Sequence, residues 1–187
     1  MERNEAIEIL AEGRGDAVSV VTMQSIYPWH QAGQGEIFHV DASQCMGSAS
    51  SIGLGLAMAR PDKKVIVLDG DGSLLMQLGS LVTVAGQSPA NLYHFVFNNG
   101  LHQSTGNQPL PAVGRFDWVG LAKSSGYADA LRLEAAEDLL ERLPDLLAMT
   151  GPVLIELVIE REDRDPLWAG VPMWKQTALL KEQLEAS

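Results

Sequence analysis

Short apolar runs of strand length alternate along this chain with longer helical stretches. Two of the runs, at residues 65–68 and 153–159, are almost continuously apolar. Strands have this composition when helices cover both faces of a parallel sheet, because neither face of the strand then meets water. The alternation therefore predicts βαβ units that build a parallel sheet.

The same pattern gives approximate bounds for each element. We expect strands at residues 17–22, 37–40, 64–68, 92–97, 128–131 and 153–159. We expect helices at residues 4–12, 47–59, 73–86, 117–125, 135–149 and 173–186. The helix at 135–149 has one apolar side, formed by Leu139, Leu140, Leu143, Leu146 and Leu147. The prediction is an α/β fold: a three-layer sandwich with a mainly parallel sheet of about six strands.

Length and charge limit the domain count and the partners. The chain has 187 residues, which favours one domain spanning residues 1–187. Its net charge of −11 opposes the phosphate attraction that nucleic-acid binding needs, so nucleic acid is excluded as a partner. Its one cysteine, Cys45, allows neither an internal disulfide nor a multi-cysteine zinc site, so we expect a cytoplasmic protein. Residues 1–16 do not resemble a secretory signal, and no apolar run reaches the ~18 residues that cross a bilayer, so we expect no membrane partner.

The strand predicted at 64–68 ends in an acidic turn, Gly70-Asp71-Gly72, and a helix is expected to begin at Ser73. Two interpretations are open for this turn alone. It is either a tight strand-to-helix connection with Asp71 as a helix cap, or part of a ligand site.

The next strand favours the ligand site. Residues 92–97 run directly into Asn98-Asn99-Gly100, and 25 residues, enough for one helix and one strand, separate Gly72 from Asn98. Neighbouring parallel strands end at the same edge of the sheet, so Asp71 and the asparagine pair can reach a common point.

One carboxylate, one amide oxygen and a loop carbonyl form a partial shell of hard oxygen donors. Magnesium is commonly held by few protein ligands together with phosphate oxygens. The backbone amides of Gly72 and Ser73, at the expected helix start, would face those phosphates. The sequence thus predicts a magnesium diphosphate ligand.

These residues resemble the fingerprint of the thiamine diphosphate enzymes: Gly-Asp-Gly, an interval of this size, then Asn-Asn. The resemblance implies the thiamine diphosphate-binding fold, with thiamine diphosphate and magnesium as cofactors. It also implies that Asp71, Asn99 and the backbone carbonyl of Leu101 hold the magnesium ion, with Gly70 in the same motif.

A closer resemblance extends over most of the chain. Residues 47–55, 70–81 and 104–108 are similar to the beta subunits of sulfopyruvate decarboxylases and to the C-terminal halves of phosphonopyruvate decarboxylases. His102 favours the phosphonopyruvate enzymes, whereas the chain length favours the sulfopyruvate beta subunits. The implied activity is decarboxylation of a small 2-oxo acid.

The resemblance also assigns roles to residues before the helix expected at 47–59. Met46 stands where the family places an apolar side chain that wedges between the two rings of the cofactor and bends it. Gln44 stands where the family often has a glycine, whose carbonyl contacts the aminopyrimidine. By position alone, Met46 is better interpreted as a residue that fills a gap in the core, and only the family resemblance favours the wedge.

His102 is the candidate catalytic residue. It follows the predicted metal ligand Asn99 by three positions, and a histidine can transfer a proton or orient an anionic substrate near neutral pH. The alternative is a loop histidine that only bonds the backbone. His30, His39 and His94 have weaker cases, because none shows ligand spacing with another histidine.

The family's chemistry requires a glutamate against the pyrimidine ring, and in the family a separate pyrimidine-binding domain supplies it. The resemblance therefore implies a pyrimidine-binding alpha subunit as partner, and a homodimer or larger oligomer. Trp168 and Trp174 are interpreted as interface or packing residues. The alternatives are another thiamine diphosphate subunit, such as an acetolactate synthase-like carboligase, or a non-catalytic module that only binds the cofactor.

Overall fold

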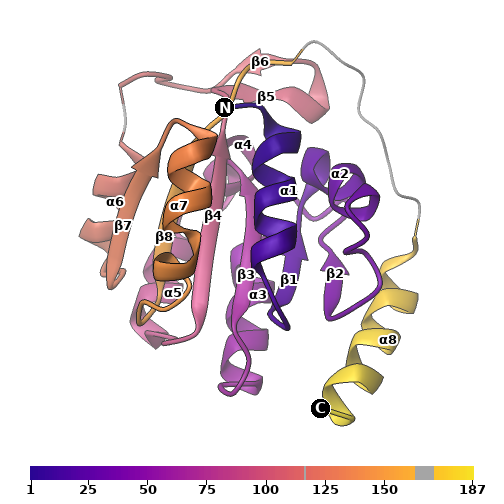
Figure 1. Cartoon of the computed structure of the whole chain (residues 1–187). Coiled ribbons are helices and arrows are strands. Elements are labelled where there is room, and N and C mark those ends of the chain that lie inside the picture. The colour runs from indigo at the N-terminus through magenta and orange to yellow at the C-terminus, as the bar shows by residue number, and fades with distance from the viewer. Residues whose placement is uncertain (116, 163–170) are drawn as a thin grey trace.

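The structure is a computed structural model that describes residues 1–115, 117–162 and 171–187. Within these residues, six strands form one fully parallel sheet in the order β2-β1-β3-β4-β8-β7 (Figure 1). The strands are β1 (Val18–Val21), β2 (His39–Asp41), β3 (Val65–Gly70), β4 (Leu92–Asn98), β7 (Asp129–Leu133) and β8 (Val153–Val158).

Helices cover both faces of this sheet. The described helices are α1 (Arg3–Gly13), α2 (Ile26–Gln31), α3 (Ala49–Ala59), α4 (Asp71–Met76), α5 (Ser80–Gln87), α6 (Trp118–Ser125), α7 (Ala136–Leu146) and α8 (Met173–Glu185). Figure 1 shows α1, α2 and α7 in front of the sheet and α3, α5 and α6 behind it, while α8 lies beside β2. The predicted α/β three-layer sandwich with about six parallel strands is confirmed.

The apolar strands divide their side chains between two cores, as their period of two requires. In β3, Ile66 and Leu68 face the core under α1, α2 and α7, while Val65 and Val67 face the core under α3, α5 and α6. All four side chains are buried. Burial on both faces explains why these strands are continuously apolar rather than alternating.

The prediction of one continuous helix at residues 73–86 is wrong. The structure has two helices there, α4 and α5, interrupted between Met76 and Ser80. Gly79 caps α5, and glycine weakens a helix interior but is accepted at this position. The first helix also begins at Asp71 rather than Ser73, so the cap is Gly70 and the interpretation of Asp71 as a cap is wrong.

Other differences concern short elements and one side chain. The sequence analysis missed α2 and the antiparallel pair β5 (Leu101–His102) and β6 (Gln108–Pro109). Leu140 is 60% exposed instead of packing with the other leucines of α7. Trp174 is 69% exposed, and Trp168 lies outside the described residues.

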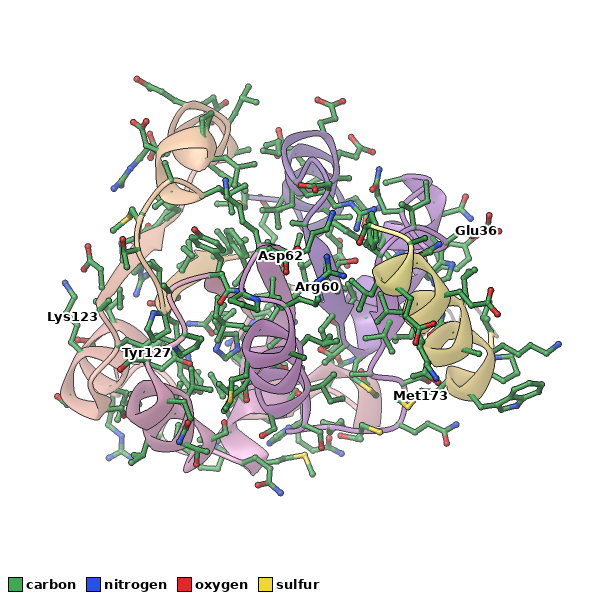
Figure 2. The ribbon with its side chains drawn as sticks, turned by 90° about the horizontal axis from the view of Figure 1, so that it is seen from below. Glu36, Arg60, Asp62, Lys123, Tyr127 and Met173 are labelled. Carbon is green, nitrogen blue, oxygen red and sulfur yellow. The ribbon has the colours of Figure 1, made fainter. Side chains whose placement is uncertain are left out.

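The C-terminal helix α8 is held to the body of the molecule by polar contacts. Gln183 donates a hydrogen bond to the Glu36 carbonyl at 2.7 Å, and Arg60 donates to the Leu184 carbonyl. Arg60 also pairs with Asp62 at 2.6 Å, and Figure 2 shows both residues in the view from below. In the described parts of the chain, no helix combines the length and apolar character needed to cross a bilayer.

Candidate functional site

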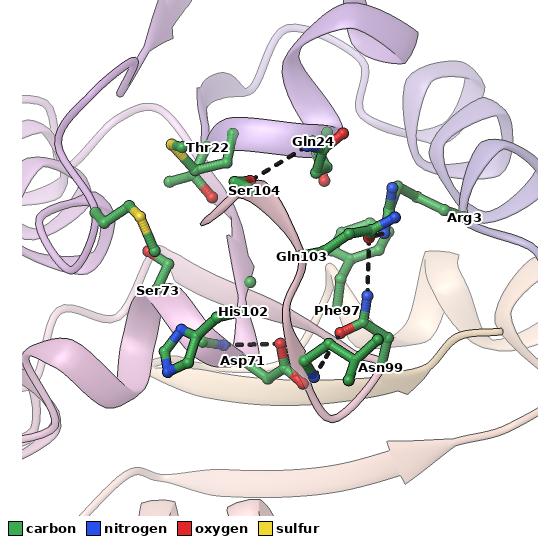
Figure 3. Close-up of a pocket in the computed structure, with 16 residues that line it drawn as sticks. Arg3, Thr22, Gln24, Asp71, Ser73, Phe97, Asn99, His102, Gln103 and Ser104 are labelled. Carbon is green, nitrogen blue, oxygen red and sulfur yellow. Dashed lines mark hydrogen bonds between the residues drawn. The ribbon is translucent and has the colours of Figure 1, made fainter. Parts of the chain in front are cut away.

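A pocket opens where β1, β3 and β4 end (Figure 3). Parallel α/β sheets commonly bind ligands at this carboxyl edge. Eight of the predicted site residues line the pocket: Met46, Gly70, Asp71, Gly72, Ser73, Asn99, Leu101 and His102. Gln44 is not among the lining residues; it is exposed, with φ 58° in the left-handed region.

Asp71 is buried in this pocket and held by backbone hydrogen bonds. It is 2% exposed, and its carboxylate accepts hydrogen bonds from the backbone N–H groups of Gly100 at 2.6 Å and of Gly72 at 2.7 Å. Burial raises the pKa of Asp71 to about 6, although these backbone hydrogen bonds oppose the shift. A buried carboxylate whose ionisation is disfavoured is one that a bound cation would stabilise.

Asn99 and Leu101 meet Asp71 from the end of β4. The Asn99 Oδ1 atom accepts from the Leu101 N–H at 3.0 Å, which turns the amide oxygen toward the loop. The Leu101 carbonyl oxygen is 3.3 Å from the point where a Cβ on Gly72 would lie. Asp71, Asn99 and Leu101 therefore line one pocket with a carboxylate, an amide and a backbone carbonyl, which are the kinds of oxygen donor that suit a magnesium ion.

Asn98 turns away from this pocket. Its Nδ2 donates to Glu156 Oε1, on β8, at 2.6 Å. The structure thus separates Asn98 from Asn99 although the sequence presents them as a pair.

A buried polar network behind Asn99 is absent from the sequence analysis. Gln103 Oε1 accepts from Asn99 Nδ2 at 2.9 Å and from Arg3 Nη2 at 2.5 Å. Arg3 is 4% exposed and pairs with Glu162 at 3.0 Å. Because the Asn99 amide nitrogen donates to Gln103 Oε1, the Asn99 amide oxygen is directed away from Gln103. Arg3 lies about a hundred positions from Asn99 in the sequence, so no local pattern could have revealed it.

Ser73 and Met46 join the pocket to the segment before α3. The Ser73 hydroxyl accepts a hydrogen bond from the Gly47 N–H at 3.0 Å, which ties this segment to the first turn of α4. A Cβ on Gly47, which has φ 84°, would lie 2.5 Å from Gln77 Cγ. The close approach of Gly47 to the Gln77 side chain explains why position 47 is a glycine. The preceding residue, Met46, lines the pocket.

His102 lines the mouth of the pocket from β5. Its Nδ1 atom is 2.6 Å from the position of a Cβ on Gly72, so the ring lies directly against the turn. Its carbonyl accepts from the Asn107 N–H at 3.1 Å, but the ring has no hydrogen-bond partner in the described residues.

A family model described as the thiamine pyrophosphate enzyme, C-terminal TPP binding domain, matches residues 18–157. This chain belongs to that family. The resemblance inferred from the Gly-Asp-Gly and Asn-Asn motifs is thereby confirmed.

Relatives of the family are found among decarboxylases. The chain is 43% identical over 122 residues to the phosphonopyruvate decarboxylase of Streptomyces viridochromogenes, covering 65% of this chain and 30% of the relative. It is 43% identical over 125 residues to the sulfopyruvate decarboxylase subunit beta of Methanothermobacter thermautotrophicus, covering 64% of this chain and 61% of the relative. The chain therefore spans less than two thirds of each of these relatives.

Solved structures agree on the fold. A thiamine diphosphate-dependent 4-hydroxybenzoylformate decarboxylase from Rhodococcus jostii superimposes with a TM-score of 0.70 at 22% identity, over 88% of this chain and 33% of that one. An enzyme of the same cofactor class from Mycobacterium smegmatis also gives a TM-score of 0.70, at 20% identity, over 87% of this chain and 32% of that one. At these identities the likeness establishes the fold alone.

Proposed function

We propose that this chain is the diphosphate- and magnesium-binding subunit of a thiamine diphosphate-dependent decarboxylase. Its substrate would be a short 2-oxo acid with a sulfonate or phosphonate end. The observation that supports the proposal is that residues carrying three oxygen donors line one pocket beside the buried Gly70-Asp71-Gly72 turn. These donors are the carboxylate of Asp71, the amide oxygen of Asn99 and the carbonyl of Leu101.

These three groups would hold the magnesium ion, and Gly70, Gly72 and Ser73 would lie against the diphosphate. A side chain at Gly72 would place its Cβ 2.6 Å from Nδ1 of the His102 ring, so the ring would have to move. Met46, at the pocket wall, would lie under the cofactor rings, and the carbonyl of Gln44 would face the aminopyrimidine. When bound, thiamine diphosphate supplies a thiazolium ring that takes up the electrons left as carbon dioxide departs.

His102 is the proposed catalytic residue. Its ring is half-buried, faces the pocket and has both nitrogens available within the described structure. A histidine in this position can hold or deliver a proton at one nitrogen and orient an anionic substrate group through the other. The decarboxylase relatives support a 2-oxo acid substrate with an anionic end.

We further propose that activity requires a pyrimidine-binding alpha subunit that supplies the activating glutamate. The name "subunit beta" of the Methanothermobacter relative supports such a partner. The proposal includes a homodimer or larger assembly in the cytoplasm, with residues 1–187 as a single domain.

The test is a decarboxylation assay on the chain purified with the subunit that accompanies it in its host. Carbon dioxide release would be followed with sulfopyruvate, phosphonopyruvate and pyruvate, with Asp71→Asn as the inactive control. We expect release from a sulfonate- or phosphonate-bearing substrate, and none from the chain alone. Acetolactate formation from pyruvate would instead identify a carboligase. Cofactor binding with no turnover of any 2-oxo acid would identify a non-catalytic module.

A further inference from the structure

Two histidines and an aspartate meet at the edge strand β2, away from the pocket described above. His39 and Asp41 are two residues apart on one face of β2, and His30 reaches them from α2. His30 Nε2 is 3.0 Å from Asp41 Oδ2, and His39 Nε2 is 2.7 Å from Asp41 Oδ1. One potential ligand atom from each residue lies within 4.8 Å of the other two.

These spacings are close to those of a metal centre. Ligands 2.0–2.1 Å from a tetrahedral zinc ion lie about 3.3 Å from one another, so small rotations of the three side chains would suffice. Two imidazole nitrogens with one carboxylate form a donor set for zinc and its neighbours among the transition metals, whereas magnesium prefers oxygen ligands.

Outer partners already hold two of the three side chains in place. His39 Nδ1 is 2.8 Å from the Ser19 hydroxyl, which also accepts a hydrogen bond from Arg14 at 3.1 Å. Asp41 accepts from the Gln176 side chain of α8, and its N–H donates to Gln176 Oε1 at 2.9 Å. Metal-binding histidines and carboxylates are characteristically oriented by such second contacts.

We propose that His30, His39 and Asp41 form a binding site for a divalent transition metal ion of the zinc type. Water would complete the coordination on the side of His30, whose side chain is 16% exposed while that of Asp41 is 2% exposed. Through Gln176, the occupied site would fasten α8 to the edge of the sheet. Its role is structural, because none of its ligands lines the pocket that contains Asp71.

The experiment measures zinc binding to the full chain. Metal analysis after dialysis is expected to give one zinc ion per chain, and cobalt is expected to give a four-coordinate spectrum without thiolate bands. At a free zinc concentration 100 times the dissociation constant, the thermal midpoint should rise by about 5–10 °C. These measurements on the wild-type chain do not depend on the folding of any variant.

A matched pair of variants locates the site. His30→Gln removes a ligand and should abolish the stoichiometric zinc and the thermal shift. His102→Gln changes another half-buried histidine, outside the cluster, and should preserve both. Absence of stoichiometric zinc in the wild-type chain would overturn the proposal and leave a plain hydrogen-bonded network. Zinc retained by His30→Gln but lost from His102→Gln would also overturn it.

Discussion

Ionisation of Asp71 should cost the folded chain stability when no cation is bound. Burial raises the pKa of Asp71 from 3.8 to about 6. A shift of about 2 pH units corresponds to about 3 kcal/mol. Between pH 4 and pH 6 the folded chain binds more protons at Asp71 than the unfolded chain does. The contribution of Asp71 to the free energy of unfolding must therefore fall as the pH rises, and the whole cost is present above pH 6.

Urea denaturation of the wild-type chain and of Asp71→Asn, from pH 4 to pH 7.5, measures this cost. Asparagine cannot ionise, and its altered hydrogen bonds to Gly72 and Gly100 add an offset that does not depend on pH. The wild-type free energy of unfolding minus that of the variant should therefore fall by up to about 3 kcal/mol between pH 4 and pH 7. All other titrating groups are common to both proteins and cancel.

Asp145→Asn, at an exposed position on α7, is the matched control for replacing one carboxylate by an amide. Adding magnesium and thiamine diphosphate at pH 7 should recover stability in the wild-type chain but not in Asp71→Asn. A flat difference curve for Asp71→Asn, or one that rises with pH, would show that burial does not dominate the electrostatics of this carboxylate.

Three further predictions concern the surroundings of the metal donors. Gln103→Leu should weaken magnesium-dependent cofactor binding by about 10- to 100-fold in calorimetric titration, because the Asn99 amide loses its hydrogen bond to Gln103. Gln108→Leu, at an exposed position, is the control and should leave this binding unchanged. His102→Ala should lower turnover ~100-fold with nearly unchanged cofactor affinity, and a loss of less than ~2-fold would make it a bystander. Gly72→Ala places a methyl group 2.6 Å from the neighbouring imidazole and should impair cofactor binding. The helical Gly55→Ala, with nothing within 4 Å, should raise thermal stability by up to ~1 kcal/mol instead.

The parallel sheet, and the position of Asp71 and Asn99 at its carboxyl edge, could be predicted from the sequence. Asp71 and Asn99 follow directly after apolar strands, and the carboxyl ends of adjacent parallel strands must lie together. Two local patterns and one topological rule therefore predicted a contact between residues almost thirty positions apart. The family motif then added Leu101, whose role as a ligand remains a prediction.

The remaining parts of the site depend on packing between distant segments. Arg3 reaches Gln103 only because α1 packs near the pocket, and neither residue stands in a recognisable motif. The His30–His39–Asp41 cluster was missed for a similar reason, since His30 lies on a short helix that the hydrophobic pattern did not reveal. Sequence spacing shows proximity only within one element or across one known crossover.

The most direct test of the proposed cofactor site is a crystal structure of the chain with thiamine diphosphate and manganese in place of magnesium. We expect an anomalous peak about 2.1 Å from the Asp71 carboxylate, the Asn99 amide oxygen and the Leu101 carbonyl, with the diphosphate completing the shell. A diphosphate bound elsewhere, or a metal peak that does not contact Asp71, would contradict it.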